Sequence, residues 1–186
     1  GNRLIFLPYY HIENTFLVPE AIFRIQQKLG VAKQYTVEQI KDMLTEFAKQ
    51  QINRCISMYV TSEIRFKAGN FDTSTDIRIE PSTPTENIAT GIIEKKNLRL
   101  KEYSSNFSDA FIQERVAYWK QKLADSLSSG WSEDARKLFY GKALLNQLQQ
   151  KIFGAKRVSI WEHIINDDDP SCVETIKELR QIIDGI

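Results

Sequence analysis

Apolar residues recur at helical spacing along the first third of the chain. A proline opens and Gly30 closes a segment from Pro19 to about Leu29, which predicts a helix there. Thr36 and Gln39 have the spacing of a capping box and predict the start of a second, amphipathic helix. The apolar stripe of this second helix consists of Ile40, Met43, Leu44, Phe47 and Ile52.

The last third of the chain also has helical periodicity. Residues 107–127 form one helical segment, which ends at Ser128-Ser129-Gly130. Ser132 opens a second segment, which is interrupted at Gly141-Lys142 and then resumes. A short helix is expected over residues 159–165, and Asp169-Pro170 caps a final helix.

Three other segments have the patterns of strands and turns. Residues 3–8 are a continuous apolar run ended by a proline, which predicts a buried strand. Residues 56–66 and 76–79 alternate between apolar and polar around Gly69-Asn70, which predicts a β-hairpin, and residues 91–93 are a candidate further strand. Residues 80–90 are rich in Ser, Thr and Pro and predict a loop. The expected fold class is α+β, mainly α: a helical domain with a short N-terminal strand and an inserted β-hairpin.

The charge balance and the lengths of the apolar runs limit the possible binding partners and the expected location of the protein. Lys and Arg number 25 against 24 Asp and Glu, so binding to nucleic acid would need a local patch. No apolar run reaches membrane-spanning length and no signal segment is evident, so we expect a cytoplasmic protein that does not bind membranes. The opening Gly1-Asn2, followed at once by an apolar run, leads us to expect a piece of a longer protein.

The residue types that bind metals are present but not at suitable spacings. Cys55 and Cys172 lie far apart in the sequence, which indicates two reduced, buried thiols. His11 and Glu13 supply two ligands, and two ligands do not make a metal site. Residues 167–169 are three aspartates before Pro170, where helix capping explains them better than cation binding. We therefore expect no metal site made of these residues.

A basic run follows residues 91–93. It comprises Lys95, Lys96, Arg99 and Lys101, which are candidates for nucleic-acid binding through phosphate contacts. A charged edge that discourages strand association explains the run at least as well. Glu94 and Lys96, with Asp72 or Asp76, also fit the Glu-x-Lys strand of a metal-dependent nuclease, although a solvated basic edge is the better explanation.

One segment resembles a known family. Residues 7–22 read LPYYHIENTFLVPEAI. They resemble the stretch after the Asp-x-Asp strand in TOPRIM nuclease domains of the OLD family and related ATPase-linked defence proteins, with Thr15 where the family usually has Tyr. Gly141-Lys142, followed by Ala-Leu-Leu, is similar to the family's Gly-Lys-x-Leu-Leu segment, and the tail after Ile164-Ile165 is similar to its ending. The resemblance covers about the first 25 and the last 55 residues.

The resemblance implies two-metal phosphodiester cleavage. In that family an upstream Glu and an Asp-x-Asp pair bind Mg²⁺ or Mn²⁺, and a later Lys stabilises charge on the phosphate. Lys142 is the implied catalytic residue, since a Gly-Lys at a helix start places a cation and free N–H groups near an anion; a plain surface lysine is an equal alternative. Glu13 and Asn14 would shape the bend beside the site without binding metal.

The same resemblance implies how the chain is divided. Residues 1–30 would end a TOPRIM-like α/β unit, residues 31–130 would be a helical and β-hairpin insertion, and residues 131–186 would be a C-terminal helical segment. The acidic metal ligands would precede Gly1, so we expect the fragment alone to be inactive and to hold no cofactor. Its partner would be DNA, bound through the parent protein, with a second copy of the chain as a further candidate.

The expected function is therefore the C-terminal portion of a TOPRIM/OLD-type DNA nuclease coupled to an ATPase, acting against phage or other foreign DNA. A non-catalytic helical interaction module is the alternative, with Trp119, Trp131 and Trp161 in packing or partner-binding roles. A self-contained Glu-x-Lys nuclease is a third and weaker hypothesis.

Overall fold

The computed structural model describes residues 11–68, 84–154 and 158–184. Within these ranges the chain is helical and contains no strand. The elements are the 3-10 helix η1 (Ile12–Phe16) and the α-helices α1 (Pro19–Lys28), α2 (Val37–Ala68), α4 (Thr85–Asn106), α5 (Asp109–Ser126), α6 (Glu133–Leu138), α7 (Gly141–Phe153), α8 (Ile160–Ile165) and α9 (Pro170–Asp184).

The chain divides into two compact units. Unit 1 consists of Gly1–Cys55 and Lys122–Ile186, and unit 2 consists of Ile56–Gln121. Both ends of the sequence therefore contribute to unit 1, and the middle of the sequence forms unit 2. Helices α2 and α5 each supply residues to both units.

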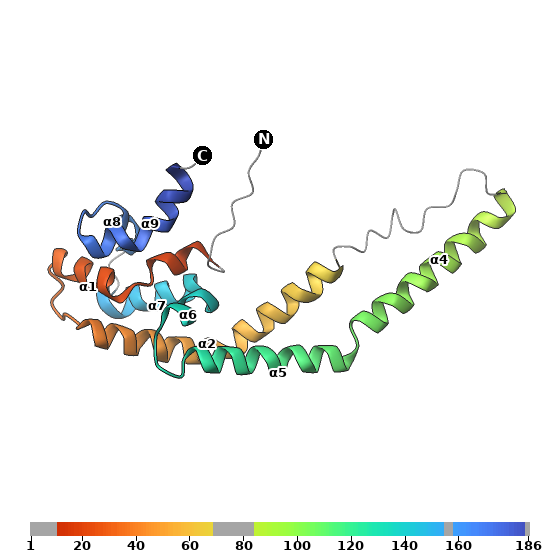
Figure 1. Cartoon of the computed structure of the whole chain (residues 1–186), viewed down its shortest axis with the longest axis horizontal. Coiled ribbons are helices and arrows are strands. Elements are labelled where there is room, and N and C mark those ends of the chain that lie inside the picture. The colour runs from red at the N-terminus through yellow and green to blue at the C-terminus, as the bar shows by residue number, and fades with distance from the viewer. Residues whose placement is uncertain (1–10, 69–83, 155–157, 185–186) are drawn as a thin grey trace. The chain divides into compact units, whose positions relative to one another are not determined.

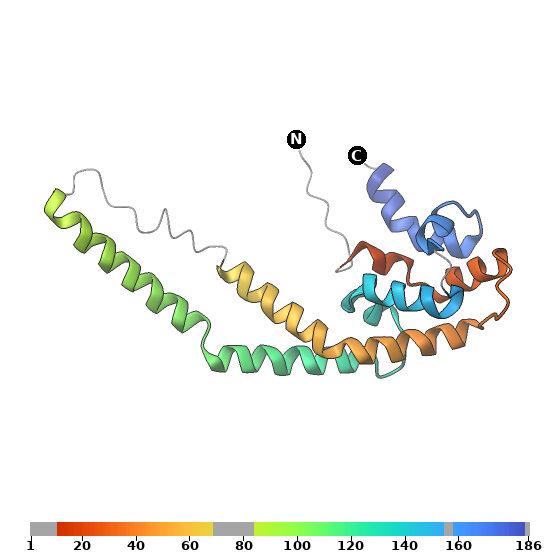
Figure 2. The same cartoon turned by 180° about the vertical axis from the view of Figure 1, so that it is seen from behind.

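Unit 1 is built around apolar side chains from η1, α1, α2, α5, α6, α7, α8 and α9. Helices α1, α8 and α9 contact one another, and η1 contacts α6, α7, α8 and α9 (Figure 1). The same packing is seen from behind in Figure 2. The large aliphatic side chains that are fully buried in this core are Leu17, Ile22, Ile25, Ile40, Leu44, Leu123, Leu144, Leu148, Ile160 and Ile164. Their removal from water is the main favourable contribution to folding of this unit.

Local capping signals set the ends of several helices, as the sequence predicted. The backbone N–H of Thr36 donates to Gln39 Oε1 at 2.9 Å, and the N–H of Gln39 donates to Thr36 Oγ1 at 3.2 Å, so the capping box is confirmed. Ser132 caps α6 through Ala135 N–H at 3.2 Å. Asp169 accepts from Ser171 N–H at 3.0 Å at the start of α9, which confirms the capping role expected of the aspartate run.

The predicted β-hairpin is wrong. Residues 56–66 belong to the long helix α2, and residues 91–93 belong to α4. The alternating apolar residues coincide with a helical stripe, because the buried positions are Cys55, Ile56, Tyr59 and Val60, which have helical and not strand spacing. The α+β fold class is therefore corrected to an all-helical one for the described residues.

Other parts of the strand and loop predictions have different outcomes. Residues 85–90 were expected in a loop, but they form the first turns of α4 directly after Pro84. The predicted strand over residues 3–8, the turn at 69–70 and the run at 76–79 lie outside the described residues. No helix in the described ranges combines the length and the apolar character that crossing a membrane requires.

In unit 2, a cluster of charged and aromatic side chains joins α2 to α5. Arg115 binds both carboxylate oxygens of Glu63 at 2.6 Å, and the indole N–H of Trp119 donates to Glu63 at 2.9 Å. The ring of Tyr59 stacks on that of Trp119, with centroids 3.8 Å apart and planes 7° from parallel. Because both elements contribute charged, aromatic and hydrogen-bonding groups to one cluster, their register is fixed.

Candidate functional site

The two sequence motifs that carry the family resemblance meet in unit 1. Asn14 of η1 is fully buried, and its side-chain amide donates to the carbonyl oxygen of Phe139 at 2.9 Å. The same amide nitrogen also donates to the carbonyl of Arg136. These carbonyls belong to the end of α6, directly before Gly141-Lys142. The bend at Asn14 is therefore fastened to the chain segment that leads into α7.

Gly141 is packed against the same asparagine. A Cβ atom at this position would lie 1.8 Å from Asn14 Oδ1 and 2.8 Å from the Asn14 backbone nitrogen. No side chain fits at such distances, so the first residue of α7 has to be glycine for η1 to approach this closely. The close approach of Asn14 thus explains why the Gly-Lys motif has a glycine at position 141, which the sequence alone did not explain.

Lys142 is exposed in the first turn of α7 and makes no ion pair with any carboxylate that the structure describes. Helix α7 has 13 residues, no acidic residue in its first turn and no side-chain cap on its N-terminus. The positive end of the helix dipole therefore adds to the lysine charge. The lysine and the helix start together favour an anion.

Tyr140 immediately precedes the Gly-Lys motif and is the N-cap residue of α7. The ring of His11 meets it edge-on, with centroids 4.6 Å apart. The guanidinium carbon of Arg54, from α2, lies 4.4 Å from the Tyr140 ring centroid. We name the group of Asn14, Arg54, Tyr140, Gly141 and Lys142 the Tyr140 junction.

Two titratable groups beside the Tyr140 junction are neutral. Burial lowers the pKa of His11, and the nearby Glu13 carboxylate only partly opposes this effect. Burial raises the pKa of the Cys55 thiol, against a backbone hydrogen bond from Tyr140 and the charge of Arg54. At neutral pH the positive charge of the junction therefore comes from Arg54 and Lys142.

Metal ligands do not converge among the described residues. Glu13 lies in η1 and is partly exposed, next to the buried Asn14. No group of three or more His, Cys, Asp or Glu side chains in the described ranges could hold a metal ion. Asp167 belongs to the aspartate run that was weighed as a cation site in the sequence analysis. Its Oδ2 atom instead pairs with Lys28 Nζ at 2.8 Å.

The candidate nucleic-acid-binding cations lie on α4, in unit 2. Lys95 and Arg99 are four residues apart and share a face of the helix, and Lys96 is one position further round. Lys101 is two residues after Arg99, which places it about 200° away around the axis. Arg99 also pairs with Glu102 at 2.7 Å. The helix does not gather the four cations on one face.

The geometry of α4 also removes the basis for a Glu-x-Lys nuclease. That site requires Glu94 and Lys96 to project from one face of a strand, where residues two apart point the same way. In the helix, two residues correspond to about 200° of rotation, so the two side chains leave opposite faces. The upstream candidates, Asp72 and Asp76, lie outside the described residues.

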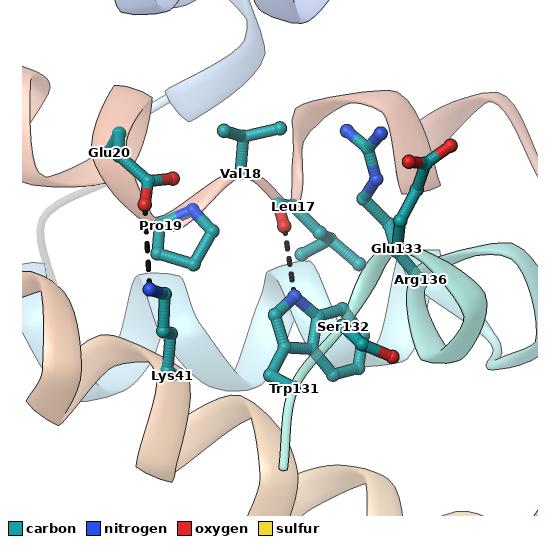
Figure 3. Close-up of a pocket in the computed structure, with 9 residues that line it drawn as sticks. All are labelled: Leu17, Val18, Pro19, Glu20, Lys41, Trp131, Ser132, Glu133 and Arg136. Carbon is teal, nitrogen blue, oxygen red and sulfur yellow. Dashed lines mark hydrogen bonds and ion pairs between the residues drawn. The ribbon is translucent and has the colours of Figure 1, made fainter. Parts of the chain in front are cut away.

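A pocket of about 220 Å³ lies between the turn from η1 to α1 and the start of α6. Leu17, Val18 and Pro19 form one side, and Trp131 lies opposite, with its indole N–H donating to the Leu17 carbonyl at 3.2 Å (Figure 3). The charged residues of the lining are the cations Lys41 and Arg136 and the carboxylates Glu20 and Glu133. Since these charges balance and Lys41 lies 3.6 Å from Glu20, the pocket has no net attraction for a polyanion.

Sequence reasoning identified Asn14 and Lys142 but missed Arg54 and Tyr140. Tyr140 comes directly before the Gly-Lys motif in the sequence, so its proximity to the motif could have been inferred from the sequence. Arg54 had no such signal, because it is a single exposed cation on a long helix and reaches the junction only through the packing of α2 on α7.

Comparisons with known proteins give no family assignment. No protein-family model, no curated protein and no solved structure matches this chain.

Proposed function

We propose that this chain is the C-terminal portion of a TOPRIM-type, metal-dependent DNA nuclease coupled to an ATPase and active against foreign DNA. Lys142 is the cation that contacts the scissile phosphate. The observation that carries the proposal is the meeting of the two motifs: Asn14 bonds the carbonyl of Phe139 and packs against Gly141, directly beside Lys142. A shared structural unit is what the family resemblance requires of segments so far apart in the sequence.

The chemistry of the Tyr140 junction is compatible with this role. A phosphodiester becomes more negative as it is cleaved, and a fixed cation beside it stabilises that charge. Lys142 is exposed, has no described carboxylate partner, and stands at the positive end of α7. Tyr140 and Asn14 position the lysine by fixing the start of the helix.

The acidic metal ligands would lie elsewhere in the parent protein, as the family resemblance implies. When bound there, Mg²⁺ or Mn²⁺ would activate the attacking water and polarise the phosphate. This chain would contribute only the positioned cation and the scaffold that holds it, and by itself it would not cleave DNA.

The test compares the parent protein with two variants in a DNA-nicking assay with Mg²⁺ or Mn²⁺. Lys142→Ala should lower the cleavage rate by about 10²–10³-fold, the loss typical of removing one group that stabilises transition-state charge. Lys151→Ala is the matched control, because Lys151 is an exposed lysine in the last turn of the same helix. Cleavage by the parent protein at an equal rate with and without Lys142 would remove the lysine from the site.

A helical interaction module is the second candidate function, and one observation favours it. Trp119 and Trp131 are buried, but Trp161 is 44% exposed and Ile165, one turn later on α8, is 39% exposed. Large exposed apolar side chains on one helix face are typical of protein contacts. The parent reading frame discriminates between the two candidates. A Walker motif and an Asp-x-Asp strand upstream favour the nuclease, and their absence favours the module.

A further inference from the structure

We infer that Arg54 is a second phosphate-binding residue of the Tyr140 junction and, together with Lys142, holds the backbone of a DNA strand. The inference rests on the proposed function for the choice of DNA as the ligand. Arg54 belongs to α2, outside the segments that resemble the family, and the structure places its guanidinium over the ring of Tyr140, two residues before Lys142 in the sequence.

Arg54 and Lys142 lack the ion pairs that many other cations of unit 1 make, and they differ from other such cations, for example Lys151, in lying next to Tyr140 in space or in sequence. Many Lys and Arg side chains of unit 1 lie against a carboxylate: Lys28 binds Asp167 at 2.8 Å, and Lys137 binds Glu133 at 2.7 Å. Arg54 and Lys142 have no such partner among the residues that the structure describes. Two cations without carboxylate partners beside one tyrosine form a local positive site in a chain whose charges otherwise nearly balance.

Several contacts hold Arg54 in place. The guanidinium carbon lies 4.4 Å from the Tyr140 ring centroid, within the range of a cation–π interaction. One turn earlier on α2, the buried Gln51 donates to Gln147 of α7 at 2.9 Å. The next residue, Cys55, accepts a backbone hydrogen bond from Tyr140. Helix α2 is thereby registered against α7, and Arg54 stays beside the residue that precedes the Gly-Lys motif.

The chemistry of each of the two side chains fits a phosphate of a nucleic-acid backbone. A guanidinium presents its N–H donors in a planar fork that binds two oxygens of a phosphate, and stacking on an aromatic ring leaves the edges of the fork available. A lysine adds a mobile point charge with three donors. A phosphodiester, with two unesterified oxygens and one negative charge, is complementary to either side chain.

The test measures binding alone, without metal or cleavage. The full chain is titrated against a fluorescently labelled single-stranded DNA oligonucleotide, and fluorescence anisotropy gives the affinity at several salt concentrations. Arg54→Gln should weaken binding by about tenfold, the loss expected for a charge-assisted hydrogen bond. It should also lower the slope of log affinity against log salt by about 0.7, the value for one lost phosphate contact. Lys142→Gln should act similarly.

Two further variants serve as controls for the loss of charge and for the geometry of the guanidinium. Lys151→Gln removes the same charge from the other end of α7 and should change the affinity by less than about twofold. Arg54→Lys keeps the charge but loses the planar fork, and should lie between the wild type and Arg54→Gln. Thermal unfolding of each variant verifies its fold, and if Arg54→Gln is misfolded, Arg54→Lys alone decides.

The possible results separate a failure of the Arg54 inference from a failure of the proposed function. Wild-type affinity in Arg54→Gln, or an equal loss in Arg54→Gln and Lys151→Gln, overturns the inference. If the parent protein needs Lys142 for cleavage while Arg54→Gln binds normally, only the inference fails and the proposed nuclease stands. If DNA binding depends on Arg54 but the parent protein does not cleave DNA, the phosphate site stands and the proposed function fails.

Discussion

Asn14 occupies the space that any side chain at position 141 would need. A methyl group on Gly141 would lie 1.8 Å from Asn14 Oδ1, and the Asn14 amide is meanwhile bonded to the Phe139 carbonyl at 2.9 Å. The asparagine and the glycine come from the two ends of the sequence and form one contact. This contact fixes where α7 begins, and therefore where Lys142 lies.

Gly141→Ala should destabilise the protein. An alanine normally stabilises a helix by about 1 kcal/mol relative to glycine. Here the added methyl group forces buried atoms apart, so we expect a net loss of about 1–3 kcal/mol in the free energy of unfolding. Urea denaturation measures it. Asn146→Ala, at an exposed position of the same helix, is the control and should change stability by less than about 0.5 kcal/mol.

Thr36→Ala should weaken the start of α2. The threonine hydroxyl accepts from Gln39 N–H at 3.2 Å, and this cap is exposed, so its loss affects few other contacts. We expect a loss of about 1 kcal/mol in the free energy of unfolding. Gln34→Ala, two residues earlier and exposed, is the control. Equal effects of the two substitutions would mean that the capping box does not contribute to stability.

The helix ends could be predicted from the sequence because their causes are local. Thr36 with Gln39, Ser132 with Ala135, and Asp169 with Ser171 each make hydrogen bonds within three residues along the chain. Such signals depend little on the rest of the fold, and the structure contains all of them.

The β-hairpin prediction failed because its evidence was ambiguous and its outcome depends on distant residues. Ile56 and Val60 fit an alternating pattern and also lie four residues apart on a helix face. Tyr59 stacks on Trp119, and Glu63 binds Arg115, so partners from α5 cover this part of α2. No local pattern in residues 56–66 contains that information.

The candidate site was only partly predictable for the same reason. Lys142 and Asn14 were found through short motifs, but the sequence could not show that Asn14 requires Gly141 to be a glycine. Arg54 joins the site by tertiary packing on Tyr140. A residue that acts only through a contact between helices distant in the sequence leaves no motif.

Glu63→Gln should destabilise unit 2. The substitution keeps an acceptor for Trp119 but removes the charge that Arg115 binds through two contacts of 2.6 Å. Both side chains are less than one-third exposed, so we expect a loss of about 1–2 kcal/mol. A double-mutant cycle with Arg115→Met should give a coupling energy of about 1 kcal/mol. Lys120→Gln, at an exposed position of α5, is the control, and additive effects of the Glu63 and Arg115 changes would contradict the coupling between these two residues.

Asp167 should make the stability of unit 1 depend on pH. A hydrogen bond from Lys28 at 2.8 Å, then one from the Asp169 backbone N–H at 3.0 Å, and the charges of Lys28 and Arg24 hold the pKa of this carboxyl below its usual range. A carboxyl with a lowered pKa in the folded state stabilises that state above its unfolded pKa, which is about 3.9. This stabilisation is lost as the pH falls through the folded pKa.

The wild type should therefore exceed Asp167→Asn in stability most clearly above about pH 5, and the difference should shrink as the pH falls below about 4. Urea denaturation at about pH 7, 5 and 3 measures this difference. Asp168→Asn, at the exposed neighbouring position, is the control. A difference between wild type and Asp167→Asn that stays constant from neutral pH into strong acid would mean that Lys28 and Arg24 do not stabilise the ionised form of Asp167.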